Sequence, residues 1–171
     1  ARYGGMSCFV VERGWKGVKV GKKEDKLGQR ASDTVAMEFD EVRVPRENLL
    51  GQEGDGFRIA MQVFDRSRPA ISALAVGVAR RAMEESVKYA NERKALGKPI
   101  GDLQAVAFMI AEMSINIDAA RLLVWRAATM AERGEKCARE AAIAKAFAAD
   151  MCMKVTTDAV QVFGGYGYSR E

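Results

Sequence analysis

The sequence predicts an α+β chain that is mainly α: the end of a β-sheet domain followed by an antiparallel up-down helical bundle that lacks its last helix. Two observations predict this class. In residues 1 to about 50, short runs alternate apolar and polar side chains with the period of two that is typical of strands. From Gly51 onward, apolar residues recur every three or four positions, the spacing of amphipathic helices. We therefore expect two domains, residues 1–50 and 51–171.

Three or four short strands are expected in the first domain. Residues 8–11 form a β-rich run, residues 14–17 supply turn chemistry, and residues 18–20 alternate. Residues 35–39 alternate as well, and the apolar phase shifts by one position at residues 40–41, which predicts a bulge or corner. So few strands cannot cover both faces of a sheet, so this region is expected to be the C-terminal part of a larger, middle β domain.

Four helical segments follow. A breaker at residues 54–56 precedes a short amphipathic helix that ends near Phe64. Pro69 suits a first helical turn and is expected to begin a second helix, which runs to about Arg93. Three long helices joined by short loops, the second and two more, predict the antiparallel bundle.

The third predicted helix is the strongest periodic signal. It extends from an N-cap at Asp102 to a stop at Gly134, which is about 32 residues or ~48 Å. It is apolar on two sides, so it must be covered on two sides, and the isolated chain is expected to be poorly folded or self-associated. One seam comprises Leu103, Val106, Ile110, Met113, Ile117, Ala120, Val124, Ala127 and Ala131; the other comprises Phe108, Ala111, Ile115, Ala119 and Leu122. The fourth helix, about residues 137–163, is rich in alanine, which lets a neighbouring backbone approach closely.

Composition excludes several chemistries. The chain has no histidine, which rules out a Ser-His-Asp triad, a Cys-His pair and a Glu-x-x-His di-iron site. Its three cysteines lack metal-binding spacing, so reduced thiols in a bacterial cytoplasm or a mitochondrial matrix are expected. The longest mostly apolar run, residues 70–79, is about half the ~20 residues that a spanning helix needs. We expect no membrane span and no targeting segment. The net charge is +4, and most of the lysines and arginines are expected to lie on solvated helix faces. A few are expected to bind phosphate groups, and no nucleic-acid partner is expected.

Three runs of residues carry chemical meaning. Residues 64–69 place Arg68 beside a predicted helix start, which suits an anionic, nucleotide-bearing ligand; the alternative is a solvated junction with a local Asp65–arginine pair. Residues 92–100 place Arg93 at a helix end, where it could bind a pyrophosphate or complement the helix dipole. Residues 161–167 follow a helix and not a strand, so their glycines do not form a Rossmann fingerprint, and a helix stop also explains them.

These runs, together with residues 26–34 and 42–51, resemble the acyl-CoA dehydrogenase family over essentially the whole chain, in order, and most closely its medium-chain and short-chain types. The fold implied is that of the family's C-terminal helical domain. The resemblance implies that Asp65 and Arg68 contact coenzyme A and that Phe64 lines the acyl cavity. Leu96 stands where the family usually has an aromatic residue, which leaves an apolar contact open there in place of a ring contact. The cofactor implied is FAD, bound partly across a subunit interface by Arg93, Lys94, Ala95, Gln104, Gln161, Gly164 and Gly165.

The activity implied is introduction of an α,β double bond into an acyl-CoA thioester, as in fatty acid β-oxidation, with electrons passed from FAD to an electron-transfer flavoprotein. The family resemblance also implies a homo-oligomer, a dimer of dimers. A carboxylate must take the α proton. Most relatives supply it from a glutamate later in the chain and a minority from the position of Ser67, so the base is expected outside this chain and the fragment alone is expected to be inactive. Two alternatives stay open: a non-catalytic helical oligomerisation module, and an oxidase or monooxygenase relative with the same fold.

Overall fold

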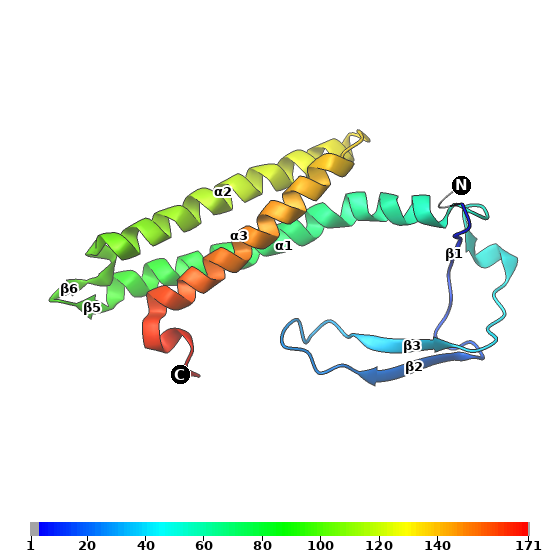
Figure 1. Cartoon of the computed structure of the whole chain (residues 1–171), viewed down its shortest axis with the longest axis horizontal. Coiled ribbons are helices and arrows are strands. Elements are labelled where there is room, and N and C mark those ends of the chain that lie inside the picture. Colours follow the sequence, from blue (N-terminus) through cyan, green and yellow to red (C-terminus); the bar gives the residue numbers. More distant parts are fainter. Residues whose placement is uncertain (1–3, 171) are drawn as a thin grey trace. The chain divides into compact units, whose positions relative to one another are not determined.

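The structure, a computed structural model, describes residues 4–170 (Figure 1). The chain divides into two compact units, Ala1–Met61 and Gln62–Glu171. Each unit has its own internal contacts. None of the helices within residues 4–170 is both long enough and apolar enough to cross a membrane.

The first unit is built from two antiparallel strand pairs. The longer pair joins β2 (Val18–Lys23) to β3 (Val35–Phe39). The shorter pair joins β1 (Cys8–Phe9) to β4 (Leu49–Leu50), which follows a single 3-10 turn at Arg46–Asn48. The predicted strands are therefore present, and their apolar side chains remain largely exposed within this unit, as expected for so few strands.

The phase shift at residues 40–41 forms a corner. Strand β3 ends at Phe39, and Glu41 adopts the left-handed region with a φ of 48°. The Asp40 N–H then donates to the carbonyl of Gly17 over 2.9 Å. A Cβ on Gly17 would lie 2.1 Å from the Asp40 carbonyl oxygen, so only glycine permits this close approach. The irregularity of the β2–β3 ladder lies elsewhere, between Val20 and Lys23.

The first long helix, α1 (Gly56–Glu92), is continuous over 37 residues, and the boundary between the two units falls within it. The prediction of two helices separated near Pro69 is therefore wrong. Proline costs a helix interior about 3 kcal/mol because it lacks an N–H and crowds the preceding turn. Here Pro69 is buried, and the hydroxyl of Ser72 donates to the Arg68 carbonyl over 2.7 Å. The burial of Pro69 offsets this local cost, which the spacing of apolar residues does not report.

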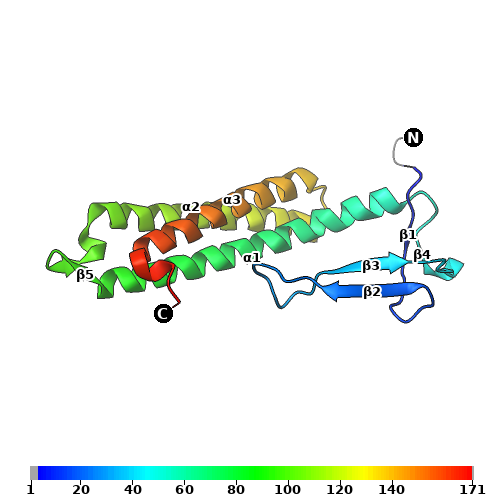
Figure 2. The same ribbon diagram turned by 60° about the horizontal axis from the view of Figure 1, so that its bottom comes forward.

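The second unit continues with a helical hairpin. Helix α2 (Gln104–Glu132) and helix α3 (Ala138–Phe163) lie side by side and antiparallel in both views (Figures 1 and 2). A small hairpin of β5 (Lys94–Ala95) and β6 (Lys98–Pro99), with a 3-10 turn at Ile100–Asp102, connects α1 to α2. A further 3-10 turn, Gly164–Gly167, follows α3. The mainly α, bundle-type fold expected from the sequence is confirmed.

The two ends of α2 differ in how well the sequence predicted them. The predicted cap at Asp102 is wrong: Asp102 lies in the 3-10 turn, and the N-cap position is Leu103, which makes no side-chain capping bond. The stop at Gly134 is confirmed, with a φ of 71°. The N–H of Glu135 donates to Met130 over 3.0 Å, which completes a Schellman-type end.

The core of the second unit is formed by one side of each helix. The predicted first seam of α2 is buried from Met113 through Ala127, and it packs against the small residues of α3. The second seam is exposed: Phe108 is 63%, Ile115 68% and Leu122 63% accessible. The helices described here therefore cover α2 on one side only. The core residues are Val76, Ala79, Ala90, Met113, Ile117, Ala120, Val124, Ala127, Ala144, Ala148, Met151, Val155, Ala159 and Val162.

Candidate functional site

A cavity of about 490 Å³ lies where the end of α1 meets the end of α3. This volume is within the range of roughly 300–1,000 Å³ that small-molecule sites occupy. Its walls combine one cation, several aromatic rings and two glycines. They comprise Tyr89, Arg93, Ile100, Val162, Phe163, Gly164, Gly165, Tyr166 and Ser169.

Arg93 supplies the positive charge of this cavity. Its N–H donates to the carbonyl of Tyr89, and its own carbonyl accepts the N–H of Ile100, both over 2.8 Å. The backbone is therefore held on both sides at the point where α1 ends. Within residues 4–170 the Arg93 guanidinium forms no ion pair, whereas Arg80 and Arg81 on α1 pair with Glu84 and Glu85. The charge of Arg93 is thus available to an anionic ligand, and its place after α1 also suits the dipole of that helix.

The glycines after α3 have different roles. Gly164 ends the helix with a φ of 60°, a conformation that favours glycine. A Cβ on Gly167 would lie 2.4 Å from the Val160 carbonyl oxygen, so that glycine lets the turn fold back on α3. Among the described residues, a Cβ on Gly164 or Gly165 would meet no heavy atom within 4 Å. Both glycines line the cavity, and their lack of a side chain leaves room for a ligand to approach the backbone.

Three of the seven predicted cofactor residues, Arg93, Gly164 and Gly165, line this cavity. The other four do not. Lys94 and Ala95 form β5, Gln104 is the first residue of α2, and Gln161 is exposed on α3 beside the cavity wall. Their contact with a cofactor, expected across a subunit interface, stays a prediction. Leu96 forms the exposed tip of the β5–β6 hairpin with a φ of 53°.

Sequence reasoning missed the aromatic residues of the cavity. Tyr89 and Phe163 stack with their ring centres 4.4 Å apart and 20° between their planes, which joins the end of α1 to the end of α3. The guanidinium carbon of Arg93 lies 5.9 Å from the centre of the Tyr166 ring. A signal was present, because Tyr89 precedes Arg93 by one helical turn, and Phe163 and Tyr166 flank the glycine pair.

The predicted substrate residues lie together on α1. The guanidinium carbon of Arg68 lies 5.3 Å from the centre of the Phe64 ring, one helical turn earlier. Asp65 forms no ion pair with any residue described, so the alternative of a local Asp65–arginine pair is not observed. The expected helix start at this point is wrong, because α1 is continuous through it. An anionic ligand at this point would therefore meet the charge of Arg68, held over the Phe64 ring, and no free N–H groups of a helix end.

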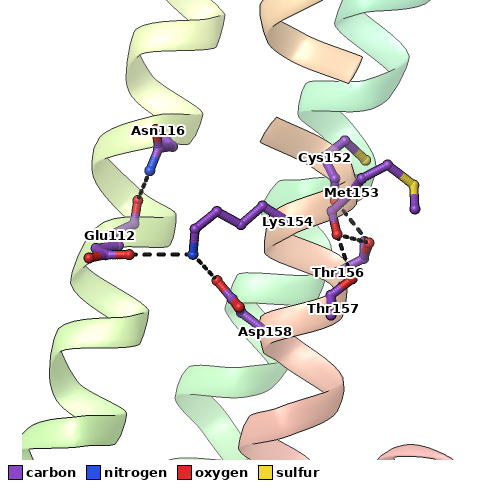
Figure 3. Close-up of polar contacts among 8 residues, drawn as sticks. All are labelled: Glu112, Asn116, Cys152, Met153, Lys154, Thr156, Thr157 and Asp158. Atoms are coloured by element: carbon purple, nitrogen blue, oxygen red, sulfur yellow. Dashed lines mark hydrogen bonds and ion pairs between the residues drawn. The ribbon is translucent and has the colours of Figure 1, made fainter. Parts of the chain in front are cut away.

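A second cavity, of about 230 Å³, lies between α2 and α3. Figure 3 shows its polar contacts: the Lys154 ammonium donates to Asp158 over 2.6 Å and lies 3.4 Å from a carboxylate oxygen of Glu112. The hydrogen bond to Asp158 raises the pKa of Lys154. Asn116 donates to the backbone carbonyl of Glu112 over 2.8 Å. Because Lys154 on α3 pairs with Glu112 on α2, we assign the group to tying α2 to α3. No cluster of potential metal ligands occurs in residues 4–170.

The chain is similar to known proteins over nearly its whole length. The chain is 48% identical over 167 residues to cyclohexane-1-carbonyl-CoA dehydrogenase of Geobacter metallireducens, which covers 98% of this chain and 44% of that protein. The structure of butyryl-CoA dehydrogenase from Megasphaera elsdenii matches with a TM-score of 0.95 and 46% identity, over 98% of this chain and 44% of that one. A chain in a structure of the electron transferring flavoprotein of Acidaminococcus fermentans matches with a TM-score of 0.93 and 48% identity, over 95% of this chain and 43% of that one.

The chain thus spans about 44% of the length of the curated relatives that it matches. Residues 54–171 match the family described as acyl-CoA dehydrogenase, C-terminal domain. Those residues include Arg68 on α1, Arg93 directly after α1, and the glycine turn after α3. The chain belongs to the acyl-CoA dehydrogenase family.

Proposed function

We propose that this chain supplies the helical part of an FAD-dependent enzyme that introduces an α,β double bond into an acyl-CoA thioester. The observation that carries the proposal is the cavity where α1 and α3 end, which joins the uncompensated charge of Arg93 to the open glycine turn. These are two of the sequence runs on which the family resemblance rests, and they lie far apart in the sequence. Relatives named for acyl-CoA dehydrogenation support the same activity.

The residues of the cavity fit part of an FAD molecule. A planar guanidinium matches a pyrophosphate better than a point charge does. The open side of Gly165 permits close approach, and the rings of Tyr89 and Phe163 suit a planar base. The C-terminal end of α3 carries partial negative charge, so we propose that phosphate lies at Arg93 and the base nearer to α3. When bound, FAD accepts the hydrogen that leaves the β carbon as hydride.

The substrate is proposed to bind along α1. Arg68, held over the Phe64 ring, would take a phosphate group of coenzyme A, with Asp65 beside it. Ser67 occupies the position from which a minority of the family supplies the base, and its hydroxyl is too weakly basic to take an α proton. We propose that a carboxylate outside residues 1–171 takes that proton.

Two partners are part of the proposal. The exposed second seam of α2 supports a homo-oligomer, proposed as a dimer of dimers, in which FAD lies between subunits and Arg93 reaches the FAD of its neighbour. The match to a chain in a structure of electron transferring flavoprotein supports such a flavoprotein as the electron acceptor.

The test uses the complete protein and two arginine variants, one at Arg68 on α1 and one at Arg93 directly after α1. Butyryl-CoA, added anaerobically, should bleach the visible absorbance of bound flavin. Arg93→Ala should weaken FAD binding by about 10- to 150-fold, because a charge-assisted hydrogen bond contributes ~1.5–3 kcal/mol. Arg68→Ala should instead raise the acyl-CoA dissociation constant and leave FAD bound. Arg81→Ala is the matched control, because Arg81 lies on the same helix and pairs with Glu85.

Each alternative has its own result. A complete protein that binds neither FAD nor acyl-CoA would favour the non-catalytic oligomerisation module. A flavin that is reduced by substrate and then reoxidised rapidly by oxygen, without electron-transfer flavoprotein, would favour an oxidase relative. Unchanged FAD occupancy of Arg93→Ala after dialysis would remove Arg93 from the site.

A further inference from the structure

The contact between Arg93 and Tyr166 has a role that the cofactor assignment leaves unexplained. We propose that Tyr166 is a positioning residue: its ring holds the guanidinium of Arg93 at the wall of the 490 Å³ cavity, in place for an anionic ligand. This inference rests on the proposed FAD site and adds to it a residue that acts through Arg93.

Arg93 needs a partner of this kind. Its backbone is fixed by the bonds to Tyr89 and Ile100, but its long side chain is exposed and has no ion pair within residues 4–170. Ordering such a side chain when the ligand binds costs conformational entropy. A carboxylate could order it beforehand, as Glu85 does for Arg81, but would neutralise the charge and compete with the ligand. An aromatic face orders the guanidinium and leaves its full charge and its N–H groups to the anion.

The direction of the Tyr166 ring is set by the turn that carries it. Tyr166 lies in the 3-10 turn Gly164–Gly167. That turn folds back tightly at Gly167, where a Cβ would meet the Val160 carbonyl oxygen at 2.4 Å. Tyr166 is 53% exposed, so burial in the core does not explain an aromatic residue at this position. Tyr166 lines the cavity, and its ring contacts the guanidinium of Arg93.

The frame of the cavity does not depend on Tyr166. The ends of α1 and α3 are joined by the stack of Tyr89 on Phe163, at 4.4 Å between ring centres. Removing the Tyr166 ring should therefore leave the fold intact and release only the Arg93 side chain. Tyr168 is the matched control, because it is two positions further on, is exposed, and is not part of the cavity wall.

The test is a double-mutant cycle on the complete apoprotein, with FAD dissociation constants from fluorescence titration and ADP as a second probe. Tyr166→Leu should weaken FAD binding about two- to fivefold, the range of a cation–π contact at an exposed site. Tyr166→Phe, which keeps the ring, should restore wild-type affinity, and Tyr168→Leu should leave it unchanged. In the Arg93→Ala background, Tyr166→Leu should cause no further loss. Thermal unfolding of each variant checks that the fold is kept.

The outcomes separate this inference from the proposed function. If Arg93→Ala weakens FAD binding while Tyr166→Leu does not, or if Tyr166→Leu weakens it equally with and without Arg93, the positioning role is wrong and the cofactor site stands. If neither Arg93→Ala nor Tyr166→Leu changes the affinity for FAD or ADP, the cofactor site itself is wrong, and the positioning role is overturned with it.

Discussion

Two isoleucines on α2 give a matched test of which side of this helix carries the stability of the chain. Ile117 is 1% exposed in the core between the helices, whereas Ile115, two positions earlier, is 68% exposed on the second seam. The test replaces each isoleucine, in turn, by alanine. Both variants remove the same atoms from the same helix, so they differ only in where the side chain points.

The expected difference follows from burial. Ile117→Ala removes three carbons from the core, which at about 0.8 kcal/mol each amounts to ~2.4 kcal/mol, and the cavity left behind raises the cost to roughly 2–5 kcal/mol. Ile115→Ala removes carbons that are mostly in water. Alanine also favours the helix by a few tenths of a kcal/mol over isoleucine, equally at both positions, so that contribution cancels in the comparison.

The assay is urea denaturation of the 1–171 chain at high dilution, followed by far-ultraviolet circular dichroism. Ile117→Ala should lower the midpoint strongly, and Ile115→Ala should leave it nearly unchanged at the same slope. Equal losses of stability at both positions would refute the reasoning, because Ile115 would then be buried in the species that unfolds.

Three further predictions follow from the exposed seam, the start of α1 and the base. The 1–171 chain should self-associate in light scattering through the seam that contains Phe108 and Leu122, and changing both to serine should reduce this; a compact monomer of the unchanged chain would count against it. The pKa of Asp55 is lowered from its ordinary value of 3.8, mainly by the hydrogen bond from Arg58, so its stabilising effect is present above 3.8 and lost as the pH falls through the lower folded value. The melting temperatures of the wild type and Asp55→Asn should therefore differ near neutral pH and converge in acid, and a constant difference would contradict this assignment. In a complete protein whose natural base is changed to glutamine, Ser67→Glu should recover part of the acyl-CoA-dependent flavin reduction; full activity of the glutamine variant with Ser67 intact would place the base elsewhere.

Periodicity predicted the long helices because it reports which side chains share a face. The buried seam of α2 from Met113 to Ala127 was read from spacing alone and is confirmed, as is the stop at Gly134. Periodicity did not predict that α1 continues through Pro69. Proline carries a local penalty that tertiary burial can offset, and burial is not visible in a spacing pattern.

The residues of the candidate site could likewise be predicted only in part from the sequence. The family, the mainly helical class and the charged and glycine-rich runs could be predicted from the sequence, because these depend on residue types at short range. The tertiary structure decided which of the predicted cofactor residues share a cavity: Arg93 with Gly164 and Gly165. It also decided that Tyr166 faces Arg93, since that contact requires the end of α1 to meet the turn after α3, an arrangement fixed by the Tyr89–Phe163 stack and the core packing. Contacts between residues far apart in a chain depend on how whole helices pack, and short-range patterns do not specify that packing.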